Sequence, residues 1–334
     1  ATLGSDDVIT DIGGTDTLKV SVSSTTATST ILNSTGVEVI QVTNTGSAAQ
    51  TFELTNASGV TTLNSFLSGT NGDVAWNDVQ ANAKVILDGS KGEITADFAN
   101  PVVVGSADTA NIEIKNNSST DVINIGDGDD EFETLNISVG TGKNSITDIE
   151  DGDSNNLGET SKIVISGSGQ LTLGEVALKD ASEIDGSSAT GKLLITHDES
   201  VDKLTGGSGD DTFTLTPADF GSSKAAKTID GGAGSDTVVF AADVAASAFT
   251  AKSSGTHSIS AETVKYADQS IVAAGTASLT PSLDVAGVTG VSKVTGKLSN
   301  ADSQNDHTIT FEVTGLPAAG TVDVSSSEYS SAQG

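Results

Sequence analysis

Short runs in which β-forming residues alternate with polar residues recur about every ten residues along the chain. The clearest runs span 19–22, 38–42, 84–87, 111–115 and 162–165, and turns rich in Gly, Asn, Asp and Ser separate them. A period of two places every second side chain on a buried face, which is typical of β-strands. The pattern therefore predicts an all-β fold. Helical periodicity is weak, and only 62–67 and 241–248 are compatible with short helical turns.

One five-residue phrase recurs: a Glu, two β-forming residues, a polar residue and another β-forming residue. It occupies 38–42, 133–137 and 262–266, and each copy follows a cluster of Gly and Asp residues. Internal repetition of this kind indicates a fold built from stacked modules. We expect each module to consist of glycine-rich turns followed by a β stack.

The composition is acidic and poor in aromatic residues. Of 334 residues, 35% are hydrophobic and only 4% aromatic, so we expect many thin cores rather than one large core. Asp and Glu number 45 against 15 basic residues, all of them Lys, and the formal net charge is −30. This chain lacks the basic face that nucleic acid or an anionic membrane would require. The negative charges of the folded chain also repel one another, and we expect bound metal cations to neutralise part of this charge.

The chain contains no Cys, which excludes disulfides, thiolate chemistry and cysteine zinc sites. No run approaches the roughly 18 apolar residues of a membrane-spanning helix, so we expect no membrane insertion. No basic-then-apolar leader begins the sequence. We expect the sequence to be a fragment or a processed form of a longer protein.

The most specific motif is the nonapeptide G-G-x-G-x-D-x-U-x, with U a large apolar residue, which occurs in full at 206–214 and 231–239. Glycine reaches backbone angles closed to other residues, so the carbonyls of such a turn can point at an ion, and the Asp adds a carboxylate. Calcium prefers about six to eight oxygen ligands of these kinds. We therefore expect Ca²⁺ sites at Gly206, Gly207, Gly209, Asp211, Gly231, Gly232, Gly234 and Asp236.

The spacing of the two full copies predicts that they stack. In a coil of two nine-residue half-turns, each loop lies on the loop about 18 residues later. Asp211 and Asp236 are 25 residues apart (236 − 211), which is 18 plus an insertion of about seven residues within 217–227. We expect the two loops to lie on the same edge of the stack and to share calcium.

Weaker copies of the motif extend the candidate metal sites. The segment 125–132 keeps the later glycine, the acid and the apolar residue, and the segments 4–8 and 14–18 keep Gly-x-Asp-x-U. These copies add Gly126, Asp127, Gly128, Asp130, Asp6 and Asp16 to the expected ligands. The copy at 139–146 has Asn144 in place of Asp and should bind more weakly. For each weak copy the alternative is an ordinary glycine-rich turn.

The loop at 151–155 begins like an EF-hand, but its sixth position is Asn156 and its twelfth is Lys162, where Gly and Glu are required. The EF-hand is therefore excluded. Asp151 and Asp153 stay candidates for a looser calcium site, with a solvated acidic loop as the alternative. The run 302–306 presents the same choice, and a plain polar turn is favoured there.

The sequence shows no constellation of catalytic residues. His197, His257 and His307 are far apart, and the nucleophile elbow G-x-S-x-G and a phosphate-binding loop are absent. We expect no catalytic residue and no organic cofactor, and the chain is not expected to be an enzyme. Trp76 is expected in the core rather than as a platform for a sugar.

The two nonapeptides resemble the RTX family of calcium-binding repeats, and the wider arrangement is similar to the RTX-type surface-layer proteins of Gram-negative bacteria. The nonapeptides and their weaker copies cover about a fifth of the chain, and phrases at 36–44, 54–63 and 184–191 support the surface-layer branch. The resemblance implies type I secretion, calcium-driven folding outside the cell and lattice assembly at the bacterial cell surface. The segment near 298–329 is similar to cadherin-like or VCBS modules of large RTX adhesins.

These observations predict an all-β fold of calcium-binding parallel β-roll or β-helix-like stacks with a C-terminal β-sandwich of the Ig or cadherin type. The expected regions are the end of an RTX block (1–20), stacked strands (21–124), an RTX β-roll (125–271) and an incomplete sandwich (272–334), where the Gly-Asp clusters stop. The expected function is that of a structural, calcium-dependent, self-assembling protein of a surface layer or filament. The alternatives are an extender or binding segment of a large RTX adhesin and the non-catalytic part of a secreted RTX hydrolase. The expected partners are further copies of the chain, with cell-surface polysaccharide as a second candidate.

Overall fold

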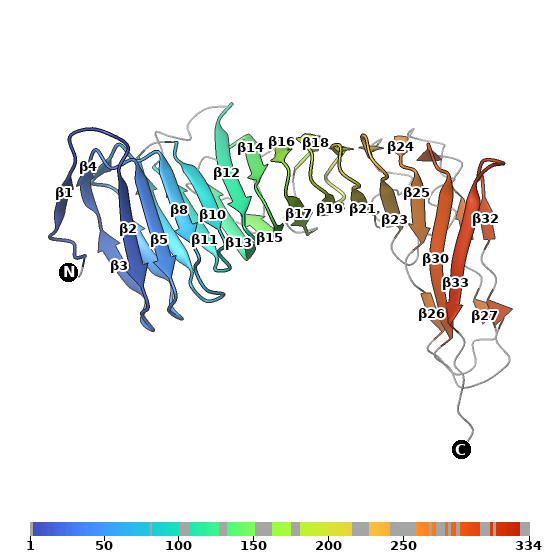
Figure 1. Ribbon diagram of the computed structural model, residues 1–334, viewed down its shortest axis with the longest axis horizontal. Coiled ribbons are helices and arrows are strands. Elements are labelled where there is room, and N and C mark those ends of the chain that lie inside the picture. Colours follow the sequence, from blue (N-terminus) through green and yellow to red (C-terminus); the bar gives the residue numbers. More distant parts are fainter. Residues whose placement is uncertain are drawn as a thin grey trace, which may run out of the picture.

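The computed structural model describes most of the chain, and all of its regular structure is β-strand. The described residues are 3–80, 82–99, 107–126, 132–150, 162–174, 181–215, 227–240, 258–266, 269–271, 278–279, 282–284, 288–300, 308–309 and 312–327. Within them the strands form parallel sheets that wind into a β-solenoid (Figure 1). The all-β, parallel-stack prediction is therefore confirmed.

Two long sheets make up the solenoid, and each coil adds one strand to each of them. The first sheet contains β2 (Thr17–Val22), β5 (Val39–Asn44), β8 (Thr62–Phe66), β10 (Lys84–Asp88), β12 (Thr109–Lys115), β14 (Thr134–Val139), β16 (Lys162–Gly167), β18 (Glu183–Ala189), β20 (Lys203–Thr205), β22 (Thr228–Asp230), β24 (Ser258–Ser260) and β29 (Val288–Thr289). The second contains β3 (Thr28–Ile31), β6 (Gln50–Glu53), β9 (Val74–Val79), β11 (Ile94–Phe98), β13 (Ser119–Gly126), β15 (Lys143–Glu150), β17 (Gln170–Leu173), β19 (Leu193–Thr196), β21 (Thr212–Leu215), β23 (Thr237–Phe240), β25 (Thr263–Tyr266), β30 (Lys293–Asn300), β26 (Gln269–Ile271) and β33 (Thr321–Ser327).

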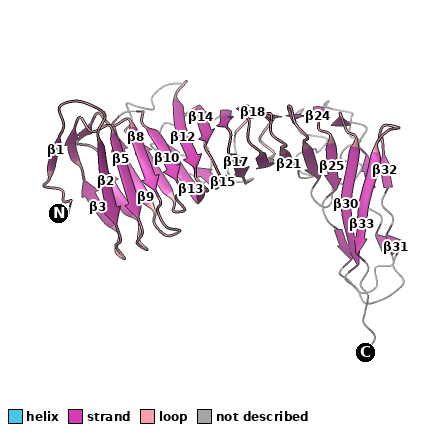
Figure 2. Ribbon diagram, in the orientation of Figure 1, coloured by secondary structure: helices cyan, strands magenta, loops and turns pink. Residues whose placement is uncertain are grey.

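Shorter ladders flank the two long sheets. A third sheet joins β1 (Val8–Thr10), β4 (Asn33–Thr35) and β7 (Ala57–Ser58). Two further pairs join β27 (Ser278–Leu279) to β31 (Thr308–Ile309) and β28 (Ser282–Asp284) to β32 (Glu312–Thr314). Figure 2 shows strands and loops throughout, and the described residues contain no helix that could cross a membrane.

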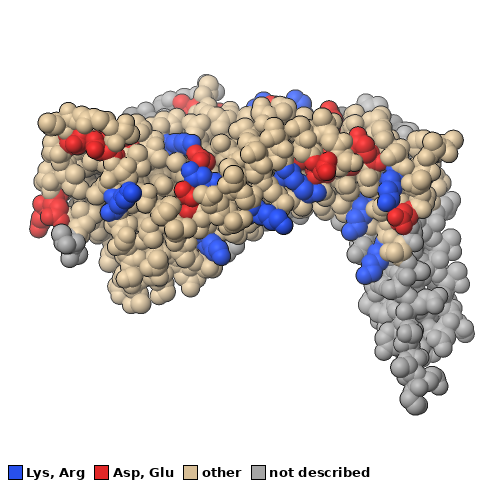
Figure 3. All heavy atoms as spheres, in the orientation of Figure 1, with Lys and Arg blue, Asp and Glu red and all other residues tan. Residues whose placement is uncertain are grey.

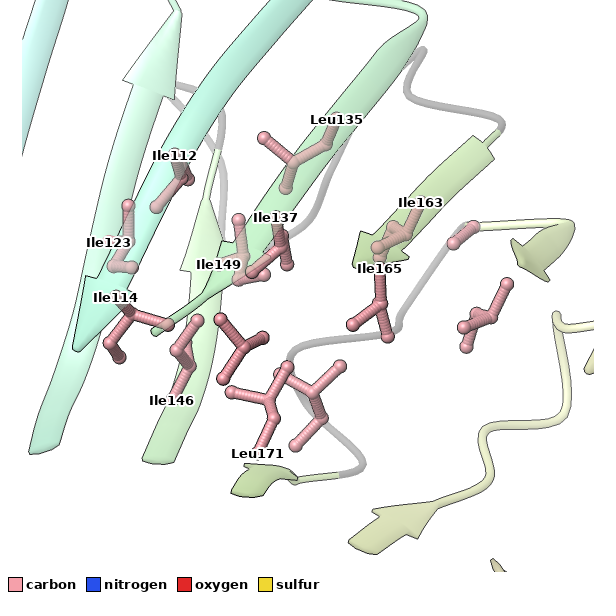
Figure 4. Packing of buried hydrophobic residues seen from close by; sticks show 14 of the residues in the cluster. Ile112, Ile114, Ile123, Leu135, Ile137, Ile146, Ile149, Ile163, Ile165 and Leu171 are labelled. Carbon is pink, nitrogen blue, oxygen red and sulfur yellow. The ribbon is translucent and has the colours of Figure 1, made fainter. Parts of the chain in front are cut away.

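The core is a stack of apolar columns between the two sheets. Strands pair in register, so Ile112, Ile137 and Ile165 are successive partners in the first sheet, and each of them is at most 1% exposed. Figure 4 shows these side chains pointing inward, toward Ile123 and Ile149 of the second sheet. Burial of one such side chain stabilises the fold by about 1.5–3 kcal/mol. The buried residues form one continuous and mostly aliphatic cluster along the solenoid, so the expectation of many separate thin cores is wrong.

Glycine is required at the corner where the chain passes from the first sheet to the second. A Cβ atom on Gly191 would collide with the carbonyl oxygen of Gly169 in the preceding coil, and one on Gly209 would collide with that of Gly191. The same close approach repeats between Gly234 and Gly209. These glycines, two of which belong to the full nonapeptides, therefore allow successive coils to stack.

The same corner carries a buried ladder of polar side chains. The backbone N–H of Asn44 donates to Ser68 Oγ at 3.0 Å, and those of Ser68 and Ser90 donate to the hydroxyls of Ser90 and Ser118 at 3.1 Å. The N–H of Ser118 then donates to Asn144 Oδ1, also at 3.1 Å. All five residues are buried. The ladder supplies partners for backbone groups that would otherwise be buried without one.

Several expectations differ from the structure. The stretch 62–67, which is compatible with a helical turn, forms β8, because Leu63 and Ser65 face inward and pair with β5 and β10. The stretch 241–248 lies outside the described residues. The described strands of the C-terminal part show no β-sandwich, and instead β30 pairs in parallel with β25 and β33. Alternation predicts strands, but it does not reveal with which strand each one pairs.

Candidate cation-binding corners

The three Glu residues of the recurring phrase make the same kind of contact, Glu38 and Glu133 before strands of the first sheet and Glu262 before a strand of the second. Each lies one residue before a strand, and each accepts a hydrogen bond from the backbone N–H of an Asp in the preceding coil. Glu38 Oε2 accepts from Asp16 N at 2.8 Å, Glu133 Oε2 from Asp108 N at 2.6 Å and Glu262 Oε2 from Asp236 N at 2.8 Å. We call these pairs the Asp–Glu corners.

Strand register positions the two acids of each corner. In the first corner Thr17 is the partner of Val39, so the residues just before them, Asp16 and Glu38, are also neighbours. The backbone closes the contact from the other side, because Val39 N donates to the carbonyl oxygen of Asp16 at 3.0 Å. The same backbone bond is present in the other corners, at 3.1 Å from Thr134 to Asp108 and at 2.9 Å from Thr263 to Asp236.

Each corner leaves one carboxylate oxygen without a hydrogen-bond partner. The Oδ2 atoms of Asp16, Asp108 and Asp236 are all buried and unpartnered, and they are three of the eight such side-chain atoms among the described residues. A buried polar atom without a partner costs about 1–3 kcal/mol, and more when it is charged. Such an atom calls for an explanation, such as an ion or a water molecule.

Two of the corners also show the electrostatic strain of crowded acids. Burial raises the pKa of Asp236 to about 6, and the charges of Asp211, Glu262 and Asp210 add to this while a hydrogen bond from Asp211 N opposes it. The hydrogen bond with Asp11 raises the pKa of Asp16, with burial and the charge of Glu38 adding to it. A positive charge at either place would relieve this repulsion.

Both nonapeptide acids accept backbone N–H groups in the later coils. Asp211 is fully buried, with Oδ1 accepting from Leu193 N at 2.8 Å and Oδ2 from Gly207 N at 2.9 Å. Asp236 Oδ1 accepts from Asp211 N at 2.9 Å. The two acids lie in neighbouring coils, as the spacing predicts, because Thr212 pairs with Thr237. Both Asp211 oxygens are therefore engaged by the backbone, whereas one oxygen of Asp236 is not.

The glycines of the full copies pack tightly against these acids. A Cβ atom on Gly206 would lie 2.6 Å from Asp211 Oδ2, and one on Gly231 would lie 2.5 Å from Asp236 Oδ2. Gly207 and Gly232 stack on carbonyl oxygens of the preceding coil, as Gly209 and Gly234 do. The motif glycines thus leave the room that the two carboxylates and the carbonyl oxygens of the preceding coil occupy.

The remaining predicted calcium ligands either lie outside the Asp–Glu corners or fall outside the described residues. Asp6 is exposed in the turn before β1, and its neighbour Asp7 accepts the N–H of Gly4 at 2.8 Å. Gly126 ends β13, and Asn144 belongs to the corner ladder. Asp127, Gly128, Asp130, Asp151, Asp153 and the run 302–306 lie outside the described residues.

No protein-family model, curated protein or solved structure matches the chain. The assignment of a site therefore depends on the geometry. Within the described residues, no group of three or more His, Cys, Asp or Glu side chains is arranged to hold a metal ion. A cation at a corner would be held by one or two carboxylates, and backbone carbonyls and water would complete its shell.

Sequence reasoning missed Asp108 and gave no chemistry to the three Glu residues. The phrase that contains Glu38, Glu133 and Glu262 is visible in the sequence, but their Asp partners lie 22, 25 and 26 residues upstream. The available signal is an Asp about one coil upstream of each Glu, with both residues directly before a β run.

Proposed function

We propose that the chain is a structural protein of an extracellular surface layer or filament, which assembles through the ends of its solenoid and is held together by calcium. The observation that carries this proposal is the solenoid itself, which has two continuous parallel sheets and an apolar core open at the β2/β3 end. The elongated stack in Figure 1 suits a spacer or lattice element.

The apolar columns are incompletely covered at the β2/β3 end. Among the described residues, β2 and β3 have a partner strand on one side only. Leu18 and Val20 are partly buried, whereas their column partners Ile40 and Val42 are 0% exposed. A hollow of about 600 Å³ lies there, lined by residues that include Leu3, Leu18, Val20, Val22 and Phe52.

The β33 end of the solenoid also exposes an apolar side chain. Val322 of β33 is the partner of Val294, which is 0% exposed, yet Val322 is 50% exposed. Among the described residues, no strand pairs with the outer side of β33. An unpaired strand edge is a template for another strand. Head-to-tail pairing of two copies would extend the ladder that joins the coils, and such a contact does not close, so it produces a filament.

Calcium is proposed to stabilise the fold of each copy by offsetting its negative charge. The net charge of −30 opposes both folding and association. On the face shown in Figure 3, lysines lie among acids along the molecule, and ion pairs such as Lys115–Glu113 at 2.8 Å and Lys203–Glu183 at 2.8 Å offset part of the charge. With 45 acids and 15 lysines, the rest of the charge requires counter-ions. Asp211, Asp236 and the carbonyls beside them supply oxygen ligands of the kind that calcium prefers.

One titration tests this proposal. We would follow β content by circular dichroism and particle size by light scattering, from chelator to a few millimolar calcium, and then image the sample by electron microscopy. A joint rise in β content and size, with regular filaments or sheets, is the expected result. Isolated rods that stay monomeric would favour an extender segment of an adhesin. Equal order and assembly in chelator would exclude the calcium role.

A further inference from the structure

We propose that the Asp–Glu corners bind hard divalent cations between successive coils, and that one of these sites, Asp108–Glu133, lies apart from the glycine-rich nonapeptides. The inference deepens the proposed calcium dependence of the fold. It assigns the ions to pairs of acids that strand register brings together, so it extends the cation sites to a part of the solenoid without a complete repeat.

The recurrence of one atom carries the inference. The corners lie at both junctions between the sheets, since Asp16 and Asp108 precede strands of the first sheet and Asp236 precedes a strand of the second. Even so, the Oδ2 atom of each is buried without a partner. At Asp236 the whole residue is 1% exposed, so water reaches this oxygen poorly. One unsatisfied atom is an irregularity, but an unsatisfied Asp oxygen beside a Glu at two equivalent corners, and at a third on the other junction, indicates a shared kind of ligand.

Two other acids in the solenoid lack the unpartnered oxygen. Asp73 Oδ1 accepts the N–H of Glu93 at 3.0 Å, which is the reverse of the bond in the corners, and this bond lies at an exposed site. Asp211 is fully buried and has both oxygens hydrogen-bonded. In all three Asp–Glu corners, by contrast, one buried Asp oxygen has no hydrogen-bond partner.

A cation explains this arrangement better than a water molecule does. Two carboxylates of neighbouring coils repel each other, and water would satisfy hydrogen bonds without removing that repulsion. All the ligand atoms at hand are oxygens, which suit calcium or magnesium rather than a softer metal. Calcium tolerates irregular geometry, whereas magnesium demands a nearly ideal octahedron. With only two carboxylates, we expect weak sites with dissociation constants of about 10⁻⁴–10⁻³ M, as in extracellular modules.

Asp108→Asn is the most direct test, because this corner lies outside the full nonapeptides. Bound calcium would be counted by equilibrium dialysis of the full chain, with magnesium in a parallel series, and thermal unfolding would be followed with and without calcium. The variant should bind one ion fewer per chain and show a smaller calcium-dependent rise in Tm. Asp73→Asn is the matched control and should bind as many ions as the wild type.

A second variant distinguishes the loss of a ligand from a failure to fold. Glu133→Gln keeps an oxygen that can accept the N–H of Asp108 and removes only the charge, and it should lose the same ion. If both variants bind as many ions as the wild type, the inference is wrong. A Tm that rises equally with and without calcium would instead indicate a proton shared between the two acids.

The outcome is separable from that of the proposed function. If wild-type protein assembles with calcium while both variants keep every ion, the function stands and the corner sites fail. If the variants lose an ion while wild-type protein stays monomeric in calcium, the corner sites stand and the self-assembling function fails.

Discussion

At the scale of single residues, Asp236 is a carboxylate with two different oxygens. Oδ1 holds the N–H of Asp211, whereas Oδ2 is buried without a partner. Asp236→Asn would keep the first contact and remove the buried charge. In chelator at pH 7.5 we expect the variant to be as stable as the wild type, or more stable by about 1–2 kcal/mol, since an unpaired buried charge is destabilising.

In calcium the difference should shrink or reverse. A ligand that binds only the folded state stabilises it by about 1.4 kcal/mol when its concentration is ten times the dissociation constant. The wild type should therefore gain stability from millimolar calcium, and Asp236→Asn should gain less. Urea unfolding in chelator and in calcium measures both effects. A variant that is less stable than the wild type by the same amount in both solutions would show that Asp236 only accepts its hydrogen bond and binds no calcium.

The glycines at the corner between the sheets lead to a second prediction at this scale. In Gly191→Ala the new methyl group meets the carbonyl oxygen of Gly169, a backbone atom that cannot move without separating two coils. We expect a loss of about 2–4 kcal/mol, in the range typical of forced overpacking or backbone strain. Gly69→Ala is the matched control, because its Cβ atom would lie 4.0 Å from the nearest atom, Asn44 O, and should cost about 1 kcal/mol or less. Thermal or urea unfolding of the pair measures the difference.

At the scale of structural elements, side-chain oxygens accept backbone N–H groups at the corner between the two long sheets. Ser68, Ser90, Ser118 and Asn144 do so in the earlier coils, and Asp211, Asp236 and Glu262 do so in the later ones. Each of these oxygens accepts from the coil before it. Neutral residues in one series of coils and charged residues in another thus satisfy equivalent backbone groups.

Ser90→Ala tests the neutral series. The change removes the acceptor of Ser68 N at 3.1 Å and the contact of the hydroxyl with Ser65 Oγ at 2.9 Å, and both groups are buried. We expect a loss of about 1–3 kcal/mol, the cost of a buried donor left without a partner. Ser166→Ala, on the half-buried outer face of β16, is the control and should change stability by less than about 0.5 kcal/mol. Amide hydrogen exchange at Ser68 would localise the effect.

The sequence predicts elements of this fold better than it predicts their roles. Alternation locates strands such as β10 and β16, because period two is a local property. Pairing is not local, so the same pattern was compatible with a sandwich at β30 and with a helical turn at β8. The nonapeptide locates Asp211 correctly in a tight corner, but its backbone hydrogen bonds depend on Leu193, in a coil that no motif marks.

At the scale of the whole molecule, the proposed self-assembly would join the β2/β3 end of one copy to the β33 end of the next. If copies join head to tail, a charge placed in the apolar column at either end should block growth, because an inward-facing charge protects a strand edge from pairing. Val20→Lys blocks the β2/β3 end and Val322→Lys blocks the β33 end. Each variant alone should stay monomeric at concentrations roughly 10–100 times above those at which the wild type assembles.

Mixing the two variants distinguishes the geometry of the contact. The free β33 end of the Val20→Lys chain can still meet the free β2/β3 end of the Val322→Lys chain, so the mixture should form a one-to-one dimer and nothing longer. Size-exclusion chromatography with light scattering would measure this mass. Ile12→Lys carries the same charge change on a fully exposed side chain and should assemble like the wild type. If the Val322→Lys chain dimerises alone, two β2/β3 ends pair with each other, and the contact is a closed two-fold one that cannot build a filament.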